Sequence, residues 1–181
     1  HSGARKRLAK QAGRLAVELV KQDLKPRDIM TRQAFENAIA VDMAIGGSSN
    51  TVLHLLAIAY EAGVELPLEL FDAISAKTPY ISKLSPGGVF HLQDLNEAGG
   101  ISAVLSEVAK KELVATQCLT VDGTLAERLA GVKIERDEVI KSIDAPYRTT
   151  GGIAILKGNL APKGAVVKES AVADDMLVFS G

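Results

Sequence analysis

The apolar residues of this 181-residue chain change their spacing part way along, and that change constrains the fold more than any other feature. Up to about residue 130 they recur every three to four positions, as in helices that bury one face. Beyond it they form short β-type runs between Gly, Pro and Asn residues, at positions 153–156, 165–168 and 176–179. We therefore expect an α/β protein with a mostly helical first part and a β-rich second part.

Capping residues and glycines predict where several helices begin and end. Thr31 precedes an apolar helical pattern and is the expected N-cap of that helix. The next predicted helix, residues 51–62, is apolar on nearly every side, which is typical of a buried helix, and Gly63 is placed to end it. The other predicted elements are a helix beginning at Pro67, a helix after Gly99 and Gly100, a strand over residues 118–121 and a helix over residues 124–130.

Charge and cysteine content narrow the possible functions. The chain has 21 Lys and Arg against 22 Asp and Glu, and this balance disfavours nucleic acid or an anionic membrane as a partner. Its one cysteine excludes an internal disulfide and a metal site built from local thiolates alone. No apolar run reaches the roughly 18–20 residues that span a bilayer. We expect a protein of a reducing compartment, the cytoplasm, with no membrane partner.

The sequence GGSSNT, residues 46–51, lies between two predicted helices and is the best candidate for a binding site. Its glycines permit backbone conformations closed to other residues, and Ser48, Ser49, Asn50 and Thr51 can cap the helix that follows. The free N–H groups and positive dipole end of that helix suit a carboxylate or phosphate. Simple capping of a buried helix uses the same residue types, so both interpretations stay open.

The other chemically active side chains have more ordinary explanations. Asp42 and His54 lie among apolar neighbours, which indicates hydrogen-bonded core groups rather than a proton-transfer pair. His91 is expected on a surface loop, and Lys168, at the end of a β-type run, in solvent. Cys118 is expected to pack as a small apolar residue. No two of the three histidines have the spacing of metal ligands.

A series of short motifs carries more information together than any of them does alone. The motifs are RDIMT (27–31), AFENA (34–38), GGSSNTVLHL (46–55), DLNEAGGI (94–101), CLTV (118–121), GGIAIL (151–156), GNLAP (158–162) and GAVVK (164–168). In this order they resemble the dihydroxy-acid dehydratase family, which also includes 6-phosphogluconate and sugar-acid dehydratases. The resemblance covers essentially the whole chain.

This resemblance implies an activity and a set of cofactors. The family removes water from 2,3-dihydroxy carboxylates to give 2-keto acids, and its branched-chain members serve isoleucine and valine synthesis. It implies an Fe–S cluster, a Mg²⁺ ion and a serine base for the full-length protein, with their ligands in motifs that this chain lacks. We therefore expect an internal segment that is inactive alone.

The resemblance also implies an organisation. Residues 1–140 would belong to the family's N-terminal α/β domain, and residues 141–181 would open its β-rich, swivelling C-terminal domain. The full-length protein would act on a small dihydroxy acid as a homodimer or larger assembly. Two alternatives stay open: a segment of a sugar-acid or 6-phosphogluconate dehydratase, and a non-catalytic module that binds a small anion.

Overall fold

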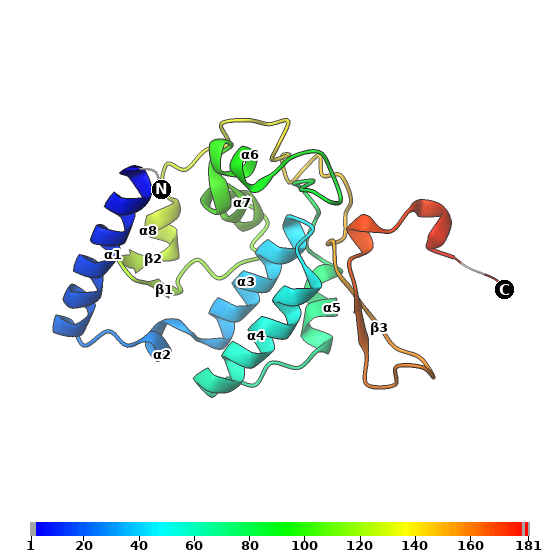
Figure 1. The fold of residues 1–181 in the computed structure, drawn as a ribbon, viewed down its shortest axis with the longest axis horizontal. Helices are drawn as coiled ribbons and strands as arrows, with labels where there is room; N and C mark the ends of the chain where they lie inside the picture. Colours follow the sequence, from blue (N-terminus) through cyan, green and yellow to red (C-terminus); the bar gives the residue numbers. More distant parts are fainter. Residues whose placement is uncertain (1–2, 179, 181) are drawn as a thin grey trace.

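The computed structural model describes residues 3–178 and 180, and it shows a mixed α/β chain in which helices predominate. The elements are α1 (Gly3–Lys21), α2 (Pro26–Ile29), α3 (Arg32–Ala44), α4 (Ser49–Ala62), α5 (Glu69–Ser75), α6 (Leu92–Glu97), α7 (Gly100–Ala109), β1 (Leu119–Thr120), β2 (Gly123–Thr124), α8 (Leu125–Leu129), β3 (Ala154–Leu156), β4 (Ala165–Val167) and the short 3₁₀ helices η1 (Glu169–Ala171) and η2 (Asp174–Met176). Figure 1 shows α1 at one end of the molecule and the β3 hairpin near the other.

Helix α3 forms the centre of the core. It packs against α4, α5 and α7, and its residues Ile39, Ala40 and Met43 are completely buried. Its start confirms the sequence prediction, because the Thr31 hydroxyl oxygen accepts a hydrogen bond from the Ala34 N–H at 3.3 Å. A hydroxyl in this position satisfies one of the free N–H groups of a helix start.

Helix α4 ends where the sequence predicts, but it begins two residues earlier, at Ser49, and its surroundings differ from the prediction. Ser48 caps its start, and Gly63, in the left-handed conformation at φ 75°, ends it. Only one face is covered, through Val52 and Ala59 against neighbouring α3 and β4. Leu53 is 66% exposed, so the prediction of a helix buried on all sides was wrong. Hydropathy shows which residues favour burial, whereas the packing partner decides which of them are buried.

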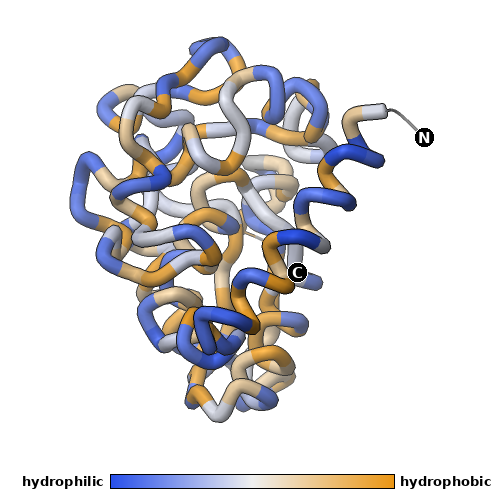
Figure 2. Tube along the Cα trace, turned by 90° about the vertical axis from the view of Figure 1, so that its left-hand side faces the viewer, coloured by the Kyte–Doolittle hydropathy of each residue, from blue (hydrophilic) through white to orange (hydrophobic). Residues whose placement is uncertain are grey.

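Helix α1 also has an apolar pattern without a cover. None of its residues is buried, and Leu8 and Val20 are exposed. Figure 2 shows hydrophobic and hydrophilic segments interleaved along this helix. Within the described residues, no helix combines the length and the hydropathy needed to cross a membrane.

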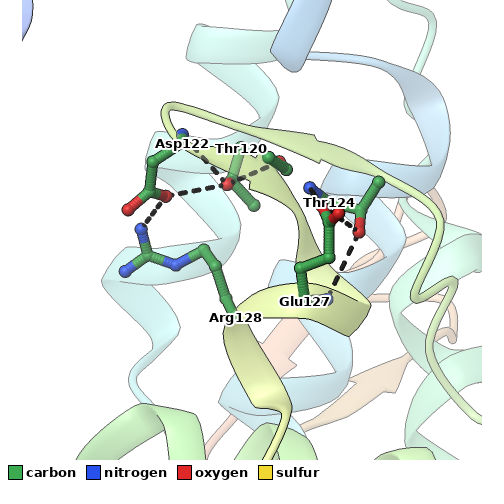
Figure 3. Close-up of polar contacts among 6 residues, drawn as sticks. Thr120, Asp122, Thr124, Glu127 and Arg128 are labelled. Carbon is green, nitrogen blue, oxygen red and sulfur yellow. Dashed lines mark hydrogen bonds and ion pairs between the residues drawn. The ribbon is translucent and has the colours of Figure 1, made fainter.

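The predicted strand and helix after Cys118 are confirmed, and a second short strand that was not predicted lies between them. Strands β1 and β2 pair antiparallel, with Leu119 opposite Thr124, and α8 follows directly. Figure 3 shows the contacts that fix this connection: the Thr124 N–H donates to Glu127 Oε2 at 2.7 Å, and the Glu127 N–H donates back to Thr124 Oγ1 at 3.3 Å. This reciprocal pair is a capping box, which satisfies two backbone donors at a helix start. An ion pair between Arg128 and Asp122 closes the turn.

Two of the three predicted β-type runs form a hairpin. Strands β3 and β4 pair antiparallel, with Ile155 opposite Val166. The Ser75 hydroxyl at the end of α5 donates to the Ile153 carbonyl and fixes the hairpin to the helical part. The third run was predicted wrongly as a strand, because η2 takes up its first residue, Met176, and no described segment pairs with residues 177–178. Residue 179 lies outside the described residues.

Two helix starts also differ from the prediction. Helix α5 begins at Glu69, so Pro67 lies just before the helix rather than at its first position. Helix α6 was not predicted at all: His91 is its N-cap, and the His91 N–H donates to Asp94 Oδ2 at 2.8 Å. An acidic residue three positions after the cap is a sequence signal that indicates such a start.

Candidate functional site

A cavity of about 560 Å³, lined by both polar and apolar residues, opens where α3 ends and α4 begins. Its wall combines residues from five places: the end of α3, the start of α4, the loop before α6, the start of α6, and the segment after β4. The lining residues are Asp42, Ile45, Gly47, Ser48, Thr51, Leu84, Ser85, His91, Leu92 and Lys168. The motif that the sequence singles out, residues 46–51, therefore forms one wall of a cavity.

Backbone conformation and close packing both require glycine in this turn. Gly46 has φ 73°, and a Cβ on it would lie 2.7 Å from Cε2 of Tyr80. At Gly47, with φ 28°, a Cβ would overlap the carboxylate of Asp42. Left-handed conformations disfavour residues with a Cβ. The two glycines thus allow the turn to lie directly on Tyr80 and Asp42.

Hydrogen bonds join this turn to both neighbouring helices. The Ser48 N–H donates to Asp42 Oδ1 at 3.3 Å, which connects the turn to the last part of α3. The Ser48 hydroxyl oxygen accepts from the Asn50 N–H at 3.2 Å and so caps α4. The capping interpretation of this motif is therefore confirmed, and it does not exclude a ligand at the start of α4.

The segment after β4 holds the turn from the other side. The Lys168 ammonium donates to the Gly47 carbonyl, and the Ser170 hydroxyl donates to the Gly46 carbonyl at 3.1 Å. The Ser170 N–H also donates to the Gly152 carbonyl at 3.1 Å. Both carbonyls of the turn are thus bound by residues more than 120 positions further along the chain.

Burial shifts the pKa values of the two charged groups in opposite directions. Asp42 is only 7% exposed, and this burial raises its pKa, although the Thr51 hydroxyl, the Ser48 N–H and the Lys168 ammonium partly oppose the rise. Burial also lowers the pKa of Lys168, and attraction to Asp42 opposes that change. Burial therefore disfavours the charged form of each group, and the attraction between the two opposite charges partly opposes that effect.

The structure separates the four candidate residues of this motif into two pairs. Ser48 and Thr51 line the cavity, whereas the side chains of Ser49 and Asn50 are exposed and do not. Asp42 is a buried, hydrogen-bonded core group, as predicted. His54 is exposed on α4, so its predicted place in the core was wrong, and it does not line the cavity with Asp42.

Two lining residues were assigned to solvent or to a surface loop by the sequence reading. Lys168 was predicted to be solvated, yet it is half-buried in the cavity wall and bonded to Gly47. His91 is exposed, as predicted, but it caps α6 and lines the same cavity. Only the capping signal of Asp94 could have placed His91 on a helix; no local signal marks Lys168.

The residues described here do not fit an Fe–S cluster or a Mg²⁺ site. Across residues 3–178 and 180, no group of three or more His, Cys, Asp or Glu side chains could hold a metal ion. Cys118 is buried and lines a separate apolar groove beside α3 and α7. An oxygen-ligated cation needs several carboxylates or carbonyls together, and here Asp42 lies beside an ammonium group instead.

Fold and site together describe a mixed α/β chain with a cavity at a helix N-terminus, lined by polar and apolar residues. Residues 1–128 match the family model for the N-terminal part of dihydroxy-acid/6-phosphogluconate dehydratases. Residues 138–181 match the model for the C-terminal part of the same family. The chain therefore belongs to the dihydroxy-acid/6-phosphogluconate dehydratase family, as its motifs indicate.

Relatives from several bacteria are similar over nearly the whole chain. A dihydroxy-acid dehydratase of Clostridium novyi is 58% identical over 180 residues, 99% of this chain and 32% of the relative. Dihydroxy-acid dehydratases of Acetivibrio thermocellus and Ruminiclostridium cellulolyticum are 57% and 54% identical over 176 residues, which are 97% of this chain and again 32% of the relative. The chain thus spans about a third of the length of the curated relatives it matches.

Proposed function

We propose that this chain is a segment of a hydro-lyase that dehydrates 2,3-dihydroxy carboxylates to 2-keto acids in branched-chain amino-acid synthesis. Its membership of the family supports this activity, as do relatives named dihydroxy-acid dehydratase at 54–58% identity. Within such an enzyme, the cavity beside residues 46–51 would bind the substrate carboxylate. The two family segments would be residues 1–140 of an α/β domain and residues 141–181 of a swivelling domain.

The observation that carries the binding role is the start of α4 beside Lys168, in the wall of one cavity. Helix α4 has 14 residues, so the partial positive charge at its N-terminus is well developed. A ligand carboxylate there would meet the Ser48 and Thr51 hydroxyls and the Lys168 ammonium. Ser49 and Asn50 would contribute through the backbone of the first turn, because their side chains are exposed.

The chain itself is proposed to bind without turnover. Loss of water requires a base for the C2 proton and an acid on the departing C3 hydroxyl. The family's Fe–S cluster and Mg²⁺ would supply such acidity, and their ligands and the serine base would come from parts of the enzyme outside this chain. A full-length enzyme would act in the cytoplasm as a homodimer or larger assembly.

Binding and turnover can be tested separately on the 181-residue chain. Calorimetric titration with 2,3-dihydroxy-3-methylbutanoate is expected to show binding, and an assay for 2-keto acid after cluster reconstitution is expected to show none. Ser48→Ala should weaken binding, whereas His54→Ala, on the exposed side of α4, should not. Tighter binding of 6-phosphogluconate would favour a sugar-acid dehydratase instead, and absence of binding by either acid would contradict the role of the cavity.

A further inference from the structure

We infer that the outer face of α4 is an interface between two copies of this chain, which pack antiparallel about a two-fold axis at Ala57. This inference rests on the homodimer of the proposed function and adds the surface through which that dimer forms. It does not involve the cavity. The outer face of α4 consists of five exposed side chains, those of Leu53, His54, Ala57, Tyr60 and Glu61.

Two large apolar side chains of this face lie in solvent when the chain is alone. Leu53 is 66% exposed, and Tyr60 is 82% exposed. They are seven residues apart, about two helical turns, so they share one flank of the helix. Ala57 lies between them, and its small side chain permits another helix to approach closely. An exposed apolar stripe with a polar border is typical of a surface that binds a partner.

The spacing around Ala57 makes the outer face complementary to itself. With 3.6 residues per turn, Leu53 and Tyr60 lie about 40–60° to one side of Ala57 around the helix axis. His54 and Glu61 lie at the same angles on the other side. A two-fold axis at Ala57 places each flank of one copy against the same flank of the other. Leu53 then meets Tyr60 of the second copy with an offset of about 1.5 Å along the helices, and His54 meets Glu61 with the same offset.

Charge complementarity favours a second copy as the occupant. Helix α4 contains no Lys, Arg or Asp, and Glu61 is its one acidic residue. In the antiparallel register each Glu61 carboxylate faces the imidazole of His54, and the two Glu61 residues lie about 12 Å apart along the helices. The partial positive charge at the start of each α4 also lies beside the partial negative charge at the end of the other. A parallel register would bring like groups and like dipole ends together.

Sedimentation velocity of the 181-residue chain over a wide range of concentrations tests the interface. The wild type should form a dimer as concentration rises. Leu53→Asp should weaken the dimer roughly a hundredfold, because a symmetric dimer loses two contacts and each interface contact of this kind corresponds to about tenfold. Leu160→Asp is the matched control: Leu160 is 98% exposed but lies between β3 and β4, so the dimer should not change.

Two further experiments test the register. Ala57→Cys should form a disulfide between copies on mild oxidation, because a residue on a two-fold axis lies next to itself, whereas Leu160→Cys should not. The native Cys118 is buried and should not compete. His54→Glu should weaken the dimer by repulsion from Glu61 of the other copy, and the double variant with Glu61→Lys should restore it. Circular dichroism should show the same helix content in every variant.

A wild type that stays monomeric would overturn the inference and would leave the outer face of α4 to another part of the full-length enzyme. A dimer that persists unchanged in Leu53→Asp, or that forms no disulfide in Ala57→Cys, would also overturn it and would mean that the homodimer contact lies elsewhere. Loss of the dimer in Leu160→Asp would count against it as well. None of these results bears on carboxylate binding in the cavity, which calorimetry measures separately.

Discussion

Replacing Gly46 by alanine tests whether the cavity depends on the close approach of the turn to Tyr80. Alanine at φ 73° costs about 1–2 kcal/mol from the backbone conformation alone. Its Cβ would lie 2.7 Å from Cε2 and 2.9 Å from the hydroxyl oxygen of Tyr80, whose ring is buried and cannot easily move aside. Overpacking of this kind costs about 1–3 kcal/mol more.

A second glycine offers a matched control for the backbone cost. Gly63 has nearly the same φ, 75°, yet a Cβ there would meet nothing within 4 Å. Gly63→Ala should therefore lose only the conformational part of the stability. For a chain of this size, each 1 kcal/mol lowers Tm by about 2–4 °C, so Gly46→Ala should melt several degrees below Gly63→Ala.

The measurement is thermal and urea unfolding followed by circular dichroism at neutral pH. Gly46→Ala should also weaken the binding of dihydroxy acid, because Gly46 and Gly47 share the turn that Ser170 and Lys168 hold. Equal Tm values for the two variants would refute the reasoning, because they would show that Tyr80 does not restrict this position.

Three further predictions concern pH, capping and the hairpin contact. Burial raises the pKa of Asp42, so the folded chain should lose stability as pH rises from the ordinary carboxyl range to that raised pKa. Urea unfolding at several pH values should show this loss in the wild type and not in Asp42→Asn. The same pH profile in variant and wild type would contradict the prediction. Thr31→Ala should cost about 1 kcal/mol through the α3 cap, and equal urea midpoints for variant and wild type would count against that role. Ser75→Ala should cost about 1–3 kcal/mol, because the buried Ile153 carbonyl loses its donor, and a Tm equal to that of the wild type would show that this bond is dispensable.

The sequence was most informative where one local pattern decides the structure. Thr31 and Gly63 mark helix ends through a bond or a backbone angle that involves only near neighbours, and both lie where the pattern places them. Ser48 is one of the four capping candidates of its motif, and the helix that it caps begins two residues before the predicted start. The β-type runs that end near Leu156 and Val167 become strands because they pair with each other. Residues 177–178 have a similar composition but no pairing partner among the described segments.

The site was harder to predict because it is assembled from distant parts of the chain. Lys168 lies beside Gly47 because β3 packs against α5 and β4 packs against α4, and no feature near Lys168 in sequence indicates that contact. His54 shows the opposite error: leucines surround it in sequence, but α4 turns it to the exposed side. Asp42 could be predicted as a buried polar group because its neighbours in sequence, Val41 and Met43, are apolar.

The contacts of Lys168 and Ser170 with the turn at Gly46 and Gly47 have a consequence for engineering. Nine of the ten lining residues lie in the stretch that matches the N-terminal family model, and Lys168 lies in the stretch that matches the C-terminal one. A chimera of two dehydratases that is joined between these two stretches would take residues 46–51 from one enzyme and residues 168–170 from the other. The turn and the residues that bind its carbonyls would then not have evolved together. Residues 46–51 and 168–170 should therefore be exchanged as one unit when such hybrids are built.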